Sequence, residues 1–511
     1  MDEHKARRRG RAATRAANSR RQPNYRQLRH PFPPQAVLPD EAVSRIHDMA
    51  LKVLADLGLK ILLPAARDLF RAAGAAVDDA SQMVRIGPEI VDEALRAAPR
   101  SFRLRASNSA REQDYAEGAM LFAAGAGCPN ATDLVRGRRP GSLRDYEETL
   151  KLQQSFDVIH IHGPSAEPQD IPAELRHYDM MRGQMVLGDK PMFVYARGRG
   201  QVAESLEMIA LGLGLGDAEL AADVWCYTVI NTNSPRQIDV PMAEGLIDFA
   251  RAGQLSIVTP FCLAGAMAPV TVTGALVLQH AEALGAIALT QLAKPGAPVS
   301  YGGFGSNVDM KSGAPAFGTP EHMKMSIGSG QLARHIGLPW RSAAGSASNI
   351  ADMQAAGENH MSLWAATLAN ATLTIHAAGW LEGGLTFGYE KFINDVEALQ
   401  TIAELSVVPE ADEASLGWDA LADVEPGGHF FATQHTMDRY ATAFYDPLVA
   451  DLSNFGTWSD SGGQTSTVRA TAIWQKLLAD YTPPEGSEDR AARLTDFIAN
   501  GKAKGGIRPS E

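Results

Sequence analysis

The chain has 511 residues, of which 45% are hydrophobic, and a formal net charge of -12. This length is too great for one small core and predicts either a large domain with extensions or two to three domains. The charge is uneven, because residues 1–30 contain ten Lys and Arg against two acidic residues, whereas the remainder carries 37 basic and 57 acidic groups. A body with such an acidic excess is not expected to bind nucleic acid.

Residues 1–32 form a basic segment that we expect to be a disordered, solvated tail, although an organelle address or an RNA-binding arm has the same composition. This segment lacks the apolar core of a signal peptide, and no stretch of the sequence is apolar enough to predict a membrane span. Cys128, Cys226 and Cys262 are odd in number and widely spaced, which argues against a disulfide framework. We therefore expect a cytoplasmic protein that does not bind a membrane.

Residues 33–118 are predicted to form a helical N-terminal region. Apolar residues recur at helical spacing from Asp40 to Leu57 and from Pro88 to Ala97, with a shorter helical piece near Ala65 to Ala73.

Eight short apolar runs alternate with longer helical segments between residues 119 and 405. The runs lie at 119–127, 158–164, 191–197, 224–231, 255–263, 298–305, 338–345 and 372–380. Most of the runs end near Gly, Pro or Asn, and the segments between successive runs are long enough for crossover helices. The pattern predicts an α/β fold, a (β/α)8 TIM barrel over residues 119–405, with a doubly wound open sheet as the competing architecture. Residues 406–511 are expected to form a C-terminal extension packed on the barrel.

Active sites of such barrels lie at the carboxyl ends of the strands, and this rule selects the candidate residues. They are Asn231 after the fourth run, Phe261 on the fifth, Phe304 on the sixth, Trp340 and Arg341 on the seventh, and His376, Trp380 and Glu382 at the eighth. If the eighth run is a regular strand, Thr372, Thr374 and His376 share one face, whereas Leu373 and Ile375 share the apolar face that would meet the helices. His376 is therefore expected to point into the barrel mouth.

Metal and nucleotide sites have weak signals. His160 and His162 share a face, but no third ligand of convincing spacing lies nearby, and there is no CxxC pair. The run "GGFGSN" lacks the spacing of a phosphate-binding loop. We expect no tightly bound metal or nucleotide. Aromatic side chains clustered at a barrel mouth would instead suit a cationic, methyl-rich ligand.

Several long motifs occur in order along the chain. They are "GRRPGSLRDYEETLKL", "NTNSP", "APVSYGGFGSNVDMKSGAPAFGTPE", "LEGGLTFGYEKFINDVE", "EPGGHFFATQHT" and "TSTVRATAIWQKLLADYTPP". With them the sequence resembles the trimethylamine methyltransferase family from about Pro31 to Pro484. The resemblance implies a barrel that moves a methyl group from an amine to the cobalt of a separate corrinoid (cobalamin) protein, and it makes a homo-oligomer plausible.

In the trimethylamine enzymes pyrrolysine occupies the junction after the seventh strand, which here falls around Gly345 to Ser348. This chain has "GSAS" at that place and so resembles the non-pyrrolysine branch, whose characterised members demethylate quaternary amines such as glycine betaine. A quaternary ammonium leaves as a neutral amine, so no general acid is needed, and small junction residues would leave room for the substrate and the corrin ring.

On this interpretation Trp340, Trp380 and Phe261, with Phe304 and Asn231, line the substrate site. His376 and Arg341 hold the substrate carboxylate, and Glu382 has a polar role at the mouth. Arg341 and Trp340 have opposite parity, so both cannot face the same site. Three alternatives stay open, namely another betaine such as proline betaine or carnitine, a zinc- or thiol-dependent methyltransferase using Cys128 and Cys262, and a betaine-binding or scaffold protein.

Overall fold

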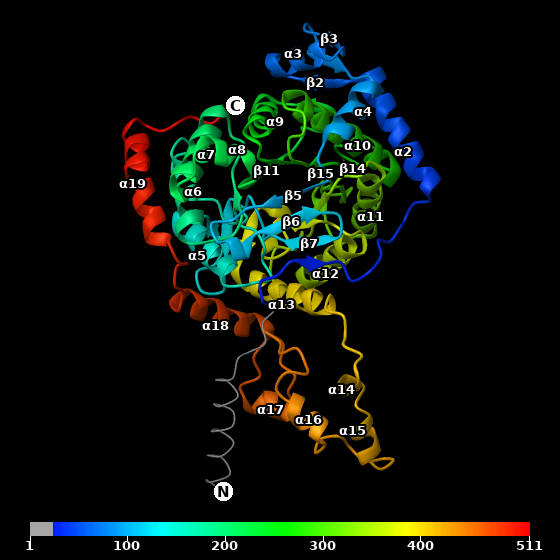
Figure 1. Ribbon diagram of the computed structural model, residues 1–511, viewed down its shortest axis with the longest axis vertical. Helices are drawn as coiled ribbons and strands as arrows, with labels where there is room; N and C mark the ends of the chain where they lie inside the picture. The colour runs from blue at the N-terminus through cyan, green and yellow to red at the C-terminus, as the bar shows by residue number, and fades with distance from the viewer. Residues whose placement is uncertain (1–23, 511) are drawn as a thin grey trace.

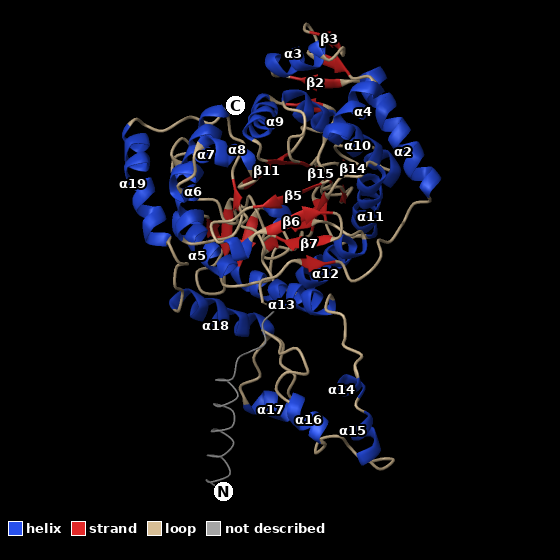
Figure 2. Cartoon of the chain, viewed as in Figure 1, coloured by secondary structure: helices blue, strands red, loops and turns tan. Residues whose placement is uncertain are grey.

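The computed structural model describes residues 24–510. Strands lie in the centre of the main body, helices surround them, and a separate arm projects from one end (Figures 1 and 2). The fold is therefore mixed α/β, as the sequence predicted.

The central sheet contains seven parallel strands and one antiparallel edge strand. Its order is β1 (Leu28–Arg29), β7 (Ala119–Phe122), β19 (Leu373–Ile375), β18 (Trp340–Ala343), β15 (Val299–Gly302), β13 (Leu255–Val258), β11 (Cys226–Ile230) and β10 (Met192–Phe193). Only β1 runs antiparallel, pairing with β7. Each of the seven parallel strands lies within one of the predicted apolar runs.

The predicted run 158–164 forms no regular strand. Ile161 makes one parallel bridge to Ala123, just beyond β7, and the His162 amide donates to the Pro191 carbonyl, just before β10, at 3.0 Å. This short segment therefore lies between the two parallel strands that end the sheet, so the sheet is strongly curled.

Helices follow the strands along the chain. They are α5 (Leu143–Gln154), α6 (Arg176–Val186), α7 (Arg199–Leu213), α8 (Asp217–Ala222), α9 (Val240–Ala252), α10 (Val272–Ala293), α11 (Pro320–His335), α12 (Met353–Leu368) and α13 (Tyr389–Leu405). Several begin at side chains that accept a backbone N–H of the first turn, as Ser142, Asp239, Thr319 and Asp352 do for α5, α9, α11 and α12. These caps fix where each loop after a strand turns into its helix.

The two faces of the sheet have different partners. The inner face is one buried cluster to which six strand segments contribute, with Leu121, Ile161, Phe193, Tyr227, Leu255, Ile257, Leu373 and Ile375 among its members. The outer face, with Val258, Val299 and Trp340, packs against the helices. Leu373 and Ile375 thus point inward, which corrects the expectation that Thr372 and Thr374 would do so.

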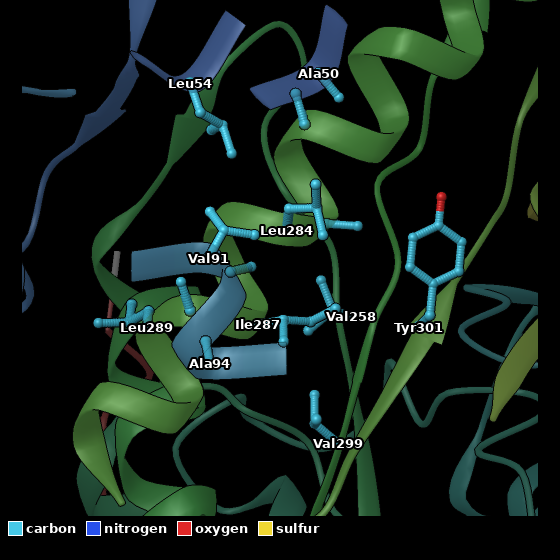
Figure 3. Close-up of a cluster of buried hydrophobic side chains, with 14 of the residues drawn as sticks. Ala50, Leu54, Val91, Ala94, Val258, Leu284, Ile287, Leu289, Val299 and Tyr301 are labelled. Atoms are coloured by element: carbon cyan, nitrogen blue, oxygen red, sulfur yellow. The ribbon is translucent and has the colours of Figure 1, made fainter. Parts of the chain in front are cut away.

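Helix α10 is the centre of the largest core cluster. Its Leu284 and Ile287 lie between the outer sheet residues Val258 and Val299 and the N-terminal helices (Figure 3). In the part of the chain that the structure describes, α10 alone is long and apolar enough to cross a membrane, which corrects the expectation that no stretch would be, yet 78% of its most apolar window is buried inside the protein. Its apolar surface is therefore accounted for by packing within the fold.

The N-terminal region contains the expected helices and also strands that the sequence did not indicate. The helices are α2 (Asp40–Lys52), continued by a π-helical turn (Val53–Leu57), α3 (Pro64–Ala72) and α4 (Pro88–Ala97), and α2 and α4 both pack on α10. The strands are β2 (Leu59–Ile61), β3 (Ala76–Asp78) and β4 (Met83–Arg85), joined by β12 (Gln237–Ile238), and the hairpin β5 (Ser101–Leu104) and β6 (Gln113–Ala116). Leu104 and Tyr115 of this hairpin belong to the inner cluster of the sheet.

Short strands also occur in the loops beyond the carboxyl ends of the central strands. One small sheet contains β8 (Asn130–Thr132), β9 (Arg139–Pro140), β20 (Trp380–Leu381) and β21 (Thr386–Gly388), and another contains β14 (Leu263–Ala264), β16 (Ser306–Val308) and β17 (Pro315–Ala316). These pairings give the loops at the mouth a defined shape.

The residues after α13 divide into packed helices and a projecting segment. α18 (Ser466–Ala479) packs on α13, and α19 (Ser487–Ala503) packs on α6 and α7. Between α13 and α18, residues 406–465, here called the arm, contain α14 (Glu413–Leu416), α15 (Trp418–Asp423), α16 (Gln434–Arg439) and α17 (Phe455–Asp460) and extend away from the body (Figure 1). Within the arm, Leu448 and Val449 are buried, and the Val449 amide donates to Glu397 of α13, whereas the four short helices lie away from the body.

Leu284→Ala is expected to lower the free energy of unfolding by about 2 to 5 kcal/mol, because it leaves a cavity in the core around α10. Urea unfolding monitored by circular dichroism measures the change. The control is Leu211→Ala on α7, where the side chain is 39% exposed and a much smaller effect is expected. Equal losses in the two variants would contradict this account of the core.

Candidate functional site

Five aromatic rings from three loops meet beyond the carboxyl ends of the central strands. This aromatic cluster consists of Phe261 after β13, Phe304 and Phe317 after β15, and His376 and Trp380 after β19. The ring of Phe304 lies 4.8 Å from Phe261, 5.6 Å from Phe317, 5.4 Å from His376 and 5.7 Å from Trp380, measured between centroids. Phe261 is the most exposed of the five, and the other four are buried.

Trp380 is held against three glycines. A Cβ atom at Gly345 would lie 2.2 Å from the indole, one at Gly384 would lie 2.5 Å from it, and one at Gly125 would lie 3.2 Å from it. These glycines come from the loops after β18, β19 and β7. The indole therefore needs close backbone approach on several sides.

The packing of Trp380 against Gly345 changes the interpretation of the small residues at the junction 345–348. The space that Gly345 provides is filled by Trp380, so it is not open to substrate at that point. The junction is also held from α12, because the Glu358 carboxylate accepts from the Ser346 hydroxyl at 2.6 Å and from the Ala347 amide at 2.8 Å. The small residues thus let a loop pack tightly against a tryptophan.

His376 lies at the mouth, but not through strand alternation. Its backbone φ is 60°, which ends β19 and turns the side chain toward the cluster, where it stacks on Trp380 at 4.5 Å. Its Nδ1 accepts from the Ala126 amide at 3.2 Å, so in the neutral ring Nε2 carries the hydrogen. Burial, and then the positive charge of Arg341, lower the pKa of His376 well below 6.5. His376 is therefore a neutral hydrogen-bond donor at physiological pH.

Arg341 is a buried cation without a carboxylate partner. It comes from β18 on the inner face, is 1% exposed, and its guanidinium lies 5.1 Å from the Phe304 ring centroid. In the described part of the chain, Nε and Nη1 find no hydrogen-bond acceptor and no ion pair forms. Burial lowers the pKa of Arg341 to about 10, so the group stays charged near neutral pH. An unpaired buried cation beside an aromatic cluster is suited to an anionic ligand group.

Trp340 does not join the cluster, which corrects its assignment to a cation site. Its side chain lies on the outer face of β18, where Nε1 donates to the Asn370 carbonyl at 3.0 Å. Since Trp340 and Arg341 are adjacent on a strand, only one could enter the site, and it is Arg341. Asn231 is exposed just beyond β11, on a loop whose Thr232 hydroxyl donates to the buried Glu282.

Glu382 is occupied by an ion pair. Arg138 donates to both of its carboxylate oxygens, with N–O distances of 2.9 Å for the two shortest contacts. Although burial favours the neutral acid, the hydrogen bonds and the charge of Arg138 lower the pKa of Glu382. A paired, ionised carboxylate is not a proton donor.

The cysteines are buried, and burial raises the pKa of the Cys128, Cys226 and Cys262 thiols. A thiol of raised pKa is a poor nucleophile because the thiolate is the reactive form. Within residues 24–510, no group of three or more His, Cys, Asp and Glu side chains is placed to hold a metal ion.

The sequence reasoning missed Phe317, which packs on Phe304 and lies 5.1 Å from Trp380. Phe317 follows a small hairpin rather than a central strand, so the rule of strand ends did not select it. It does stand in the same long motif as Phe304, "APVSYGGFGSNVDMKSGAPAFGTPE".

Gly345→Ala is expected to displace the Trp380 indole and to destabilise the protein, because the backbone φ is +123° and the added Cβ would overlap the indole. Near-ultraviolet circular dichroism and thermal unfolding measure both effects. The control is Gly74→Ala, where φ is +92° but no atom lies within 4 Å of the added Cβ. An unchanged tryptophan signal in Gly345→Ala would contradict the contact.

A model of the trimethylamine methyltransferase (MTTB) family matches residues 4–506. The glycine betaine methyltransferase of Desulfitobacterium hafniense strain Y51 is 34% identical over 470 residues, which cover 92% of this chain and 97% of the relative. The trimethylamine methyltransferase MttB of D. hafniense strain DSM 10664 is 29% identical over 475 residues, which cover 92% of this chain and 95% of the relative. The crystal structure of the Methanosarcina barkeri monomethylamine methyltransferase aligns with a TM-score of 0.43 and 10% identity, over 92% of this chain and 96% of that one.

The family model covers nearly the whole chain, and a relative above 30% identity matches over most of both sequences. The chain therefore belongs to the trimethylamine methyltransferase family.

Proposed function

We propose that this protein transfers a methyl group from a quaternary amine that bears a carboxylate, with glycine betaine as the foremost substrate, to the Co(I) of a corrinoid protein. The observation that carries this proposal is the buried, unpaired Arg341 beside the aromatic cluster. A zwitterionic betaine has a trimethylammonium group that suits aromatic rings and a carboxylate that suits a guanidinium. The similarity to the glycine betaine methyltransferase of D. hafniense strain Y51, at 34% sequence identity, supports the same substrate.

We further propose that the curled sheet is a closed (β/α)8 barrel. The supporting contacts are the Ala123–Ile161 bridge and the hydrogen bond from the His162 amide to the Pro191 carbonyl, which connect β7 to β10. In such barrels the loops at the carboxyl ends of the strands form the active site, and the aromatic cluster is built from those loops.

Within this site the side chains have separate roles. Arg341 pairs with the substrate carboxylate, and the Nε2–H of neutral His376 donates a second hydrogen bond to it. Phe261, which is partly exposed, and Phe304 contact the methyl groups of the ammonium. A trimethylammonium group over aromatic faces gains about 0.5 to 2 kcal/mol per ring, and more when water is excluded.

The chemistry requires orientation rather than proton transfer. One N–CH3 bond breaks, its electron pair stays on nitrogen, and dimethylglycine leaves as a neutral amine. The Co(I) of the corrinoid protein, the second substrate, supplies the electron pair for the new methyl bond. Because nothing must be protonated, the neutral His376 and the paired Glu382 are consistent with the reaction. The protein contributes by fixing the direction of the methyl group and excluding water.

The direct test is methyl transfer from glycine betaine to free cob(I)alamin, monitored by the change in visible absorbance. We expect methylcobalamin and dimethylglycine in equal amounts. The same assay with proline betaine, carnitine, choline and trimethylamine identifies the preferred substrate. Choline and trimethylamine lack a carboxylate and should react much more slowly than the betaines. Faster reaction of trimethylamine than of any betaine would overturn the proposal.

Arg341→Met should raise the dissociation constant of glycine betaine by about 100-fold, since charged hydrogen bonds of about 2 to 3 kcal/mol are lost. Calorimetric titration with glycine betaine measures the dissociation constant. Methionine removes an unpaired buried charge, so the variant is expected to remain folded. The matched control is Arg96→Met on an exposed position of α4, which should bind as the wild type does.

Binding of glycine betaine should not change between about pH 6 and pH 8, because the lowered pKa keeps His376 neutral throughout this range. The same titration repeated across this range checks the expectation. A binding transition centred near pH 6.5 that is lost in His376→Asn would show that His376 binds substrate as a cation.

A further inference from the structure

The arm, residues 406–465, exposes an unusual number of aromatic side chains. Trp418 is 75% exposed, Phe431 80%, Tyr440 71%, Phe444 86% and Phe455 77%. Scattered exposed apolar residues are normal, but this many within one short segment mark a surface that binds something. The arm leaves the body between α13 and α18, and nothing in the described part of the chain covers these rings.

The arm is also strongly acidic. Residues 406–465 contain ten Asp and Glu against a single Lys or Arg, Arg439. The acidic residues stand close to the exposed rings in sequence, as Asp419 follows Trp418 and Asp446 follows Phe444 by two residues. A surface that combines aromatic faces with carboxylates favours arginine, because a guanidinium both stacks on rings and pairs with carboxylates. Two such arms would repel each other, so the charge disfavours arm-to-arm pairing.

A segment with the complementary composition lies in the same chain. Residues 1–23 contain eight Lys and Arg, seven of them Arg, against two acidic residues. This segment joins the described structure next to the base of the arm, since Arg26 Nη2 donates to the Ala403 carbonyl at 3.2 Å and contacts Glu404 at 3.4 Å. Ala403 and Glu404 are in the last turn of α13, directly before the arm begins.

We propose that the Arg-rich residues 1–23 bind the acidic, aromatic surface of the arm in the same chain. Twenty-three residues can span up to about 75 Å when extended, which is ample to follow the arm from its base. Attachment at Arg26 keeps the segment near the arm, so binding within one chain has a higher effective concentration than binding between chains. This site is independent of the proposed methyl transfer.

The experiment uses the full-length protein and brief digestion with trypsin, which cuts after Lys and Arg. Mass spectrometry measures the rate of cleavage between residues 5 and 21. Bound arginines are protected, so we expect cleavage to be at least about 10-fold faster at 0.5 M than at 0.05 M salt, because salt screens exposed charges. Carbodiimide cross-linking should join Lys5 to carboxylates of residues 406–465.

The arm variant replaces three exposed carboxylates, Asp419→Asn, Asp423→Asn and Asp446→Asn, none of which caps a helix N-terminus. At low salt, trypsin should cleave this variant between residues 5 and 21 at least about 10-fold faster than the wild type. The matched control carries Asp48→Asn, Glu93→Gln and Asp496→Asn, which remove three exposed carboxylates from the body. Trypsin should cleave residues 1–23 of this control at the wild-type rate. Equal rates in the arm variant and the wild type would overturn the proposal, provided that circular dichroism shows both folded.

Dilution distinguishes binding within one chain from binding to a second copy. Protection within one chain is independent of protein concentration, whereas protection by a second copy falls on dilution. Cross-linking of mixed 14N and 15N protein gives the same distinction. Protection that disappears on dilution, or cross-links of mixed isotope, would overturn binding within the same chain.

Discussion

The candidate site depends on the packing of the Trp380 indole against Gly125, Gly345 and Gly384. Each glycine belongs to a loop that follows a different strand, so one side chain packs against the backbone of all three loops. With these loops in place, the ring of Phe304 lies against the same indole. Close packing of this kind tolerates little added volume, which makes the glycines as important to the site as the aromatic residues.

Arg341 is the second determinant, and its burial has an energetic cost. A guanidinium without a carboxylate partner in the protein interior is destabilising, and the aromatic face of Phe304 compensates for only part of that loss. Buried ionisable groups with shifted pKa values cluster at functional sites. On the proposed function, this cost favours a ligand with a carboxylate over one that is purely cationic.

Apolar runs and their spacing were sufficient to predict the α/β class and seven of the central strands. They did not predict which side chains of β19 point into the interior. Alternation assigned Thr374 to the interior, but Leu373 and Ile375 occupy it, because a sheet buried on both faces has no polar side to reveal its orientation. His376 reached the mouth through a positive φ, which sequence spacing does not report. The prediction for Trp340 was wrong because an aromatic residue on a strand at the mouth suggested a cation site, whereas its position on β18 directs it to the outer face, under the helices.

The hairpin β5–β6 has a consequence for the order of events in a reaction at this site. Its Leu104 and Tyr115 pack into the inner face of the curled sheet, so apolar side chains fill the interior below the aromatic cluster. On the function proposed above, a small molecule at Arg341 reaches the site from the loop side, because these apolar side chains fill the opposite end of the interior. On the same proposal, a corrinoid protein that docks on the loop side covers this path. Binding would follow a compulsory sequence, with the amine first and the larger protein second, and the demethylated product would wait for the protein to leave.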